Sequence, residues 1–493
     1  MIELVKKGRI MMDFSPAHSN IPVYGKPVSS YIRKTMKVIF LFVILTVSNL
    51  NLYAQNNQKA DSLMLRSIFD NALTDKRIEP DLFYLTKNIG SRISGSENAR
   101  KAIEWAKAKM EEIHPDKVYL QEVVVPHWIR GSKEASSFTT KNGKVAVMSV
   151  SALGGSIATN GLLKAQVVEV RSWAELDDLG LAGVKGKFVF FNRPMDPREI
   201  EVFKAYLAAA DQRAKGAIEA AKKGAVGALV RSLTLSIDDF PHTGTMNYEA
   251  GVNKIPAAAL STKSADLLSV ELKNNPALLY TLQMNCKQLP DVKSYNVIGE
   301  ITGANKPEEI ISMGGHIDSW DLSEGASDDG TGFVQTLEVL RLIQERGARP
   351  ERTFRAILYI NEEAGAHGAY EYARIAGLSG EKHIAVLESD AGGFSPRGFR
   401  IDGNPEAVAK IKSWKSLLTP YKVDDIQPDQ RGIDLIPMKD ISKVLISLTC
   451  DDQRFFDIHH SGLDTFDKIN IREVELGAAS MAAMVSLISK YGL

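Results

Sequence analysis

The feature that most constrains the fold is a regular alternation of apolar strands and helices from Ser294 to the C-terminus. Short apolar runs typical of buried strands alternate with segments whose apolar residues recur at helical spacing. The pattern predicts strands over 308–316, 353–363, 382–390 and 442–448, and helices over 331–344, 366–375, 406–417 and 473–491. We therefore expect an α/β fold with a mixed, mainly parallel sheet covered by helices on both faces.

Potential metal ligands follow each of these predicted strands. In chain order they are His316, Asp318, Asp328, Asp329, Glu362, Glu363, Asp390, His459 and His460. The carboxyl ends of parallel strands meet at one edge of a sheet, so these side chains should converge there. Imidazole and carboxylate groups suit zinc. Any one residue could instead be a helix cap or a turn residue, but their recurrence at successive strand ends favours a metal site.

Five segments resemble successive motifs of the zinc aminopeptidase and glutamate carboxypeptidase family of co-catalytic two-zinc exopeptidases. They are GGHIDSWD, GASDDGTG, NEEAGAHGA, ESDAGG and HHSGLDT. GSRISGSENARKAIEWAKAKM and VPHWIRGS resemble the N-terminal region of such enzymes, and GVKGKFVFFN and AAKKGAVGALV resemble their protease-associated insert. The resemblance covers nearly everything after residue 54. It implies the zinc exopeptidase fold with an inserted protease-associated-like, β-rich domain.

The same resemblance implies two Zn²⁺ per chain and assigns five ligands. His316 and Asp390 would bind one zinc ion, Glu363 and His460 the second, and Asp328 would bridge both. In this arrangement the two ions share a water molecule and lower its pKa toward neutrality.

Two further roles follow from the resemblance. Glu362 would be the general base, and Asp318 would orient the His316 ring without binding zinc. His460 is preferred to its neighbour His459 because the family places an Asp-Thr pair four residues after the ligand, where Asp464-Thr465 stands here.

The chain is expected to have four parts. An N-terminal extension and signal peptide occupy 1–54, the N-terminal part of the peptidase domain 55–140, the insert 141–288 and the main catalytic part 289–493. The third part contains short β-rich runs separated by turns, together with an alanine-rich helix over 205–223. No paired acid and base stands out within it, so we expect it to shape access to the site without taking part in the chemistry.

Residues 36–54 have the pattern of a secretory signal. A basic start at Met36-Lys37 precedes an apolar run over 38–47 and a small residue, Ala54. The run is short for a transmembrane helix, which needs about 20 apolar residues, so a membrane anchor is the less favoured alternative. We expect export to the periplasm or outside the cell, cleavage near Ala54 and no stable membrane insertion afterwards. Translation starting at Met36, instead of Met1, would explain the unusual length before the apolar run.

The charge balance and the cysteine content limit the classes of partner and of scaffold that fit this chain. The chain has 60 basic and 60 acidic residues, which argues against a nucleic-acid binder. Its two cysteines, Cys286 and Cys450, exclude a disulfide-rich scaffold, and whether they pair is open. The expected partner is a peptide substrate, and the family resemblance also points weakly to a homodimer.

The resemblance implies hydrolysis of dipeptides or short peptides with free termini. Three alternatives stay open from the sequence: an aminopeptidase acting on longer peptides, a single-zinc glutaminyl cyclase, and a non-hydrolytic binding protein or receptor ectodomain. The last predicts that ligands are lost, whereas all five expected ligands are present.

Overall fold

The computed structural model describes residues 30–429 and 432–493, so part of the predicted N-terminal extension, residues 1–29, lies outside the described residues. Helix α1 (Ser30–Thr74) contains the predicted signal segment and its expected cleavage point after Ala54. Within the described ranges, no helix combines the length and the apolar content that crossing a membrane requires. The chain divides into two compact units, and the second, Ser62–Leu493, contains both sheets.

The catalytic part is built on an eight-stranded mixed sheet with the order β1-β10-β12-β11-β13-β16-β14-β15. Its strands are β1 (Lys117–Ile129), β10 (Lys287–Ile301), β11 (Lys306–His316), β12 (Arg352–Tyr359), β13 (Lys382–Glu388), β14 (Pro396–Gly403), β15 (Asp425–Pro428) and β16 (Val444–Cys450). The central strands β12, β11, β13 and β16 are parallel, and β10 and β14 pair antiparallel on either side of them. The expected α/β fold with a mixed sheet is confirmed.

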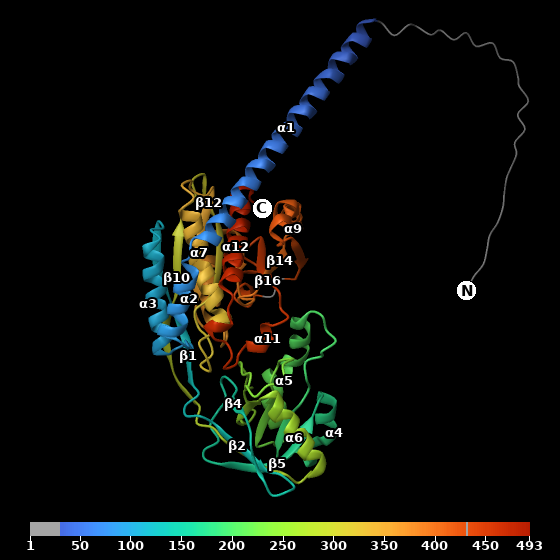
Figure 1. The fold of residues 1–493 in the computed structure, drawn as a ribbon, viewed down its shortest axis with the longest axis vertical. Coiled ribbons are helices and arrows are strands. Elements are labelled where there is room, and N and C mark those ends of the chain that lie inside the picture. Colours follow the sequence, from blue (N-terminus) through green and yellow to red (C-terminus); the bar gives the residue numbers. More distant parts are fainter. Residues whose placement is uncertain (1–29, 430–431) are drawn as a thin grey trace, which may run out of the picture. The chain divides into compact units, whose positions relative to one another are not determined.

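Helices cover both faces of this sheet, and Figure 1 labels those of one face. One face packs against α2 (Ile78–Phe83), α3 (Glu97–Glu112), α7 (Thr331–Gln344) and α12 (Ile471–Tyr491). The other face packs against α8 (His367–Ser379). The shorter helices of this part are α9 (Pro405–Ser413), α10 (Lys415–Leu418) and α11 (Phe455–Ile458). Every residue of β12 is buried, because helices exclude water from both of its faces.

A second eight-stranded sheet has the order β3-β2-β9-β5-β6-β7-β8-β4. Its strands are β2 (Ala135–Thr139), β3 (Val145–Val147), β4 (Val150–Ala152), β5 (Leu163–Val170), β6 (Phe188–Phe191), β7 (Gly227–Arg231), β8 (Ala257–Leu260) and β9 (Leu279–Gln283). Helices α4 (Trp173–Val184) and α5 (Val202–Lys222) pack on one face, and α6 (Thr262–Asn274) packs on the other. We call this body, residues 135–283, the insert. Its first strand begins before the expected boundary at residue 141.

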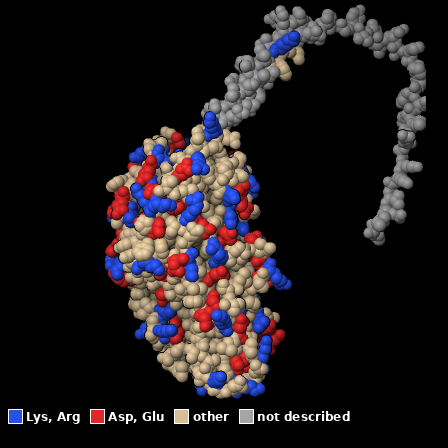
Figure 2. Space-filling model, in the orientation of Figure 1, with Lys and Arg blue, Asp and Glu red and all other residues tan. Residues whose placement is uncertain are grey.

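The surface carries interspersed charges of both signs. On the face drawn in Figure 2, basic and acidic side chains alternate, and no broad patch of one sign is visible there. This distribution agrees with the balanced composition of the chain.

Candidate metal centre

The loops after four parallel strands bring the predicted ligands together at the carboxyl edge of the catalytic sheet. His316 is the last residue of β11, and its Nε2 atom lies 3.2 Å from Asp328 Oδ1 and 3.6 Å from Asp390 Oδ1. Asp390 follows β13, and Asp328 precedes helix α7. We call these three residues the first group, because His316 contacts both carboxylates.

The second group shares the Asp328 carboxylate. The Nε2 atom of His460 lies 3.1 Å from Asp328 Oδ2 and 3.1 Å from Glu363 Oε2. The neighbouring His459 stacks on His460, and its Nε2 atom lies 3.4 Å from the same Asp328 oxygen. Of the two histidines, only His460 lies within 4.0 Å of Glu363. Asp328 thus stands between the two groups, with one oxygen facing each.

Both histidine rings are held by a backbone carbonyl at Nδ1, which leaves Nε2 directed at the carboxylates. His316 Nδ1 lies 2.9 Å from the carbonyl oxygen of Asp318, and His460 Nδ1 lies 3.3 Å from that of Thr243. A ring that donates from Nδ1 presents the lone pair of Nε2, the form that binds a metal ion.

Two nearby carboxylates hold the backbone of the ligand loops. Asp329 accepts hydrogen bonds from the amides of His316 and Gly332, at 3.0 and 2.8 Å. Asp464 accepts from the amides of Ser327 and Asp328, at 2.6 and 3.1 Å. Such contacts fix the positions from which ligands project.

The Asp318 carboxylate contacts the loop that follows β12. It accepts hydrogen bonds from the amides of Asn361 and Glu362, at 2.6 and 3.1 Å, and so positions the residue expected to be the base. The His316 ring is oriented by the Asp318 carbonyl, whereas the carboxylate lies 3.8 Å from Nδ1.

Glu362 and Glu363 have different surroundings although they are adjacent. Glu363 is buried and pairs with His460, whereas Glu362 is half-buried and has no histidine within 4.0 Å. Burial raises the pKa of the Glu362 carboxyl well above its usual range, and Asp390 and Glu363 raise it further against the opposing effect of His316. Among the ligands, the side chains of Asp390 and His460 stay partly exposed, at 19% and 10%.

Arg92 holds the backbone of the loop between His316 and Asp328. It is fully buried and donates to the carbonyl oxygens of Ile317, Glu324 and Gly325 at 2.8 to 3.0 Å. Sequence reasoning did not single out Arg92, nor the contacts of Asp464. Arginines in Ser/Gly loops are common, and these three carbonyls are more than 220 residues away in the chain.

The chemistry of the donors fits metal ions. Asp328 Oδ2 and Glu363 Oε1 are buried and have no hydrogen-bond donor in the described part of the chain. Burying ionised carboxylates in this way is costly unless a cation compensates their charge. Two imidazole nitrogens and three carboxylates suit zinc.

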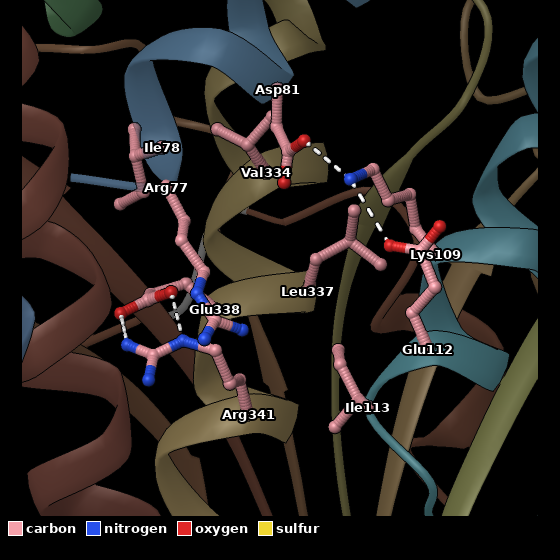
Figure 3. A pocket seen from close by; sticks show the side chains of 10 residues that line it. All are labelled: Arg77, Ile78, Asp81, Lys109, Glu112, Ile113, Val334, Leu337, Glu338 and Arg341. Atoms are coloured by element: carbon pink, nitrogen blue, oxygen red, sulfur yellow. Dashed lines mark hydrogen bonds and ion pairs between the residues drawn. The ribbon is translucent and has the colours of Figure 1, made fainter. Parts of the chain in front are cut away.

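A separate small cavity lies between α2, α3 and α7 (Figure 3). It is lined by apolar residues and by two ion-pair networks, Asp81–Lys109–Glu112 and Glu338–Arg341. Burial raises the pKa of Glu338 to about 7 although Arg341 opposes the shift. None of the candidate ligands lines this cavity, so its ion pairs belong to helix packing.

Comparisons with known proteins identify the family of the chain. Residues 296–485 match peptidase family M28. The chain is 34% identical to human carboxypeptidase Q over 410 residues, which cover 83% of this chain and 84% of the relative. It is 36% identical to carboxypeptidase Q of Xenopus laevis over 405 residues, covering 81% and 84%.

Solved structures show the same fold. A peptidase M28 precursor from Shewanella amazonensis SB2B superposes with a TM-score of 0.83 at 31% identity, covering 88% of this chain and 97% of that one. A zinc aminopeptidase from Bacillus subtilis superposes with a TM-score of 0.60 at 18% identity, covering 83% and 93%. The fold, the centre and the relatives define a metallo-exopeptidase. The chain belongs to peptidase family M28 and is related to carboxypeptidase Q.

Proposed function

We propose that the protein is a two-zinc exopeptidase that hydrolyses dipeptides or short peptides with free termini. The observation that carries the proposal is the placement of the Asp328 carboxylate between two histidines. Its Oδ1 contacts His316, which also contacts Asp390, and its Oδ2 contacts His460, which also contacts Glu363. Bridging carboxylates of this kind allow two ions to be held side by side.

The residues of this chain supply binding, orientation and proton transfer. Bound zinc ions would provide Lewis acidity toward the attacking water and the scissile carbonyl. Glu362 has no histidine within 4.0 Å and is partly exposed, so in its ionised form the carboxylate would accept the proton of the water and pass it to the leaving amine. Asp318 holds the Glu362 amide and keeps this base in place.

Arg213 supports a preference for a free carboxyl terminus. It lies on α5 beside the histidine pair, and a Cβ at Gly244 would meet Arg213 Nη1 at 2.5 Å and His460 Nδ1 at 2.8 Å. Its guanidinium donates to the Thr243 carbonyl and the Tyr206 hydroxyl, at 3.1 and 2.7 Å. Among the described residues, no carboxylate lies within 4.0 Å of it to neutralise its charge. A substrate carboxylate would provide that partner.

The remaining parts of the proposal concern export and the insert. The signal pattern before Ala54 supports export to the periplasm or outside the cell. The insert, taken as a protease-associated-like domain, contributes Arg213 and bounds the centre on the His460 side. N-terminal sequencing of the exported protein tests the cleavage point.

A panel of small substrates tests the function. Zinc-loaded protein is expected to hydrolyse a free dipeptide faster than the same dipeptide with an acetylated amine or an amidated carboxyl group. Product release measured by chromatography gives kcat/KM for each. If the protein instead favours peptides of five or more residues, it is an aminopeptidase. Conversion of N-terminal glutamine without hydrolysis would identify a cyclase.

The Arg213→Gln variant should lose the preference for the free carboxyl group. We expect KM for the free dipeptide to rise about 10- to 100-fold, because a charge-assisted hydrogen bond contributes about 1.5–3 kcal/mol. KM for the dipeptide amide should change little. Lys215→Gln, which removes an exposed positive charge from the same helix, is the matched control. An equal loss on both substrates would show that Arg213 acts through folding instead.

A further inference from the structure

The two histidines of the centre are anchored by different parts of the molecule. The carbonyl that holds His316 belongs to Asp318, two residues along the same loop. The carbonyl that holds His460 belongs to Thr243, in the loop between β7 and β8 of the insert. The histidine of one ligand group is therefore oriented by a residue of the catalytic part, and the histidine of the other group by a residue of the insert.

Three hydrogen bonds join this insert loop to the histidine pair. Besides the contact at His460 Nδ1, the Thr243 amide donates to the His460 carbonyl at 2.8 Å. The His242 ring, 2% exposed, donates from Nδ1 to the His459 carbonyl at 2.7 Å. The contact thus fixes both the ring of His460 and the backbone that carries it.

The loop is in turn fixed to the insert sheet. The Thr243 hydroxyl donates to the Ala152 carbonyl on β4 at 2.8 Å, and the His242 amide donates to the Ser232 hydroxyl after β7 at 2.8 Å. Gly154 exchanges backbone hydrogen bonds with Gly244 and Met246, which follow Thr243, at 3.0 Å each. Movement of the insert sheet would therefore carry the Thr243 carbonyl with it.

We propose that the insert sets the zinc affinity of the group formed by Glu363 and His460, with His242 and Thr243 as its positioning residues. The inference rests on the proposed two-zinc function. Partners that orient a ligand typically contribute 10- to 100-fold to metal affinity. Because coupling between binding and conformation is reciprocal, zinc at this group also stabilises the docked position of the insert. The insert thus affects zinc binding as well as the access of substrate to the centre.

Two conservative variants and one matched control test the coupling. Thr243→Val removes the hydroxyl that ties the loop to β4, and His242→Phe removes the donor to His459 while keeping a ring of similar size. Thr281→Val is the control, because it removes a comparable hydroxyl-to-carbonyl bond of 2.9 Å between insert strands β9 and β2. Metal-free proteins are titrated with zinc against a chromophoric chelator, which gives a dissociation constant for each equivalent.

We expect both loop variants to bind one of the two equivalents as wild type does and the other about tenfold more weakly, with the control unchanged. In wild type, the equivalent that the loop variants bind weakly should also slow hydrogen exchange of the Thr243 amide. If wild type binds two equivalents and both loop variants match it, the coupling is refuted while the proposed function stands. If wild type binds no second equivalent, the two-zinc function itself fails. Thermal unfolding without metal identifies a variant that is merely misfolded.

Discussion

Glu362→Gln is expected to keep both zinc ions and near-native substrate affinity while kcat falls about 10³- to 10⁴-fold. Glu362 is half-buried and unpaired with the histidines, so the substitution removes a proton acceptor without removing a ligand. Glu363→Gln should instead weaken one zinc site, because Glu363 lies 3.1 Å from His460 within the ligand set. Excess zinc should then restore part of the activity of Glu363→Gln and none of the activity of Glu362→Gln.

The two substitutions control for each other because they change adjacent, chemically identical side chains. Zinc content by atomic absorption and turnover of a free dipeptide are measured on the same preparations. Loss of a zinc ion from Glu362→Gln, together with two zinc ions in an inactive Glu363→Gln, would reverse the assigned roles.

The core of the catalytic sheet was predictable because its signal is local. Strands β11, β12, β13 and β16 are continuous apolar runs, and α7 spans the expected residues 331–344. Strands β14 and β15 were not expected. β14 is only partly buried and β15 is short and mostly exposed, so neither shows the apolar run that marks a central strand.

The convergence of the candidate ligands was predictable for the same reason, since each follows a parallel strand. What the sequence could not give is which atom of a residue makes each contact. Asp318 was expected to orient the His316 ring; its carbonyl faces that ring, whereas its carboxylate faces the next loop. The contact of the insert loop with the centre could not be predicted either. Thr243 is 217 residues from His460 in the chain and contacts it through its own backbone, which any residue type supplies.

Removal of zinc is expected to abolish activity and to lower stability, with a stability loss that grows as pH rises. At a zinc concentration of a thousand times Kd, each site contributes about 4 kcal/mol. Without metal, bound protons must compensate the negative charge of the carboxylates in the centre. Burial raises the pKa of Glu363 and of Asp390, and the carboxylates of Glu363 and Asp328 overcome the effect of burial on His460 and raise its pKa to about 10.

The direction of this pH dependence follows from the number of protons bound in the folded and unfolded states. Groups with raised pKa values bind more protons in the folded protein than in the unfolded chain, so metal-free stability falls as pH rises. For His460 this loss extends from its unfolded pKa of about 6.5 up to about 10. Zinc competes with those same protons and binds more tightly at higher pH. The gap in Tm between zinc-loaded and chelator-treated protein should therefore widen from pH 6 to pH 9. A constant or narrowing gap, measured by calorimetry at fixed free zinc, would mean that the bound metal does not replace the protons on these residues.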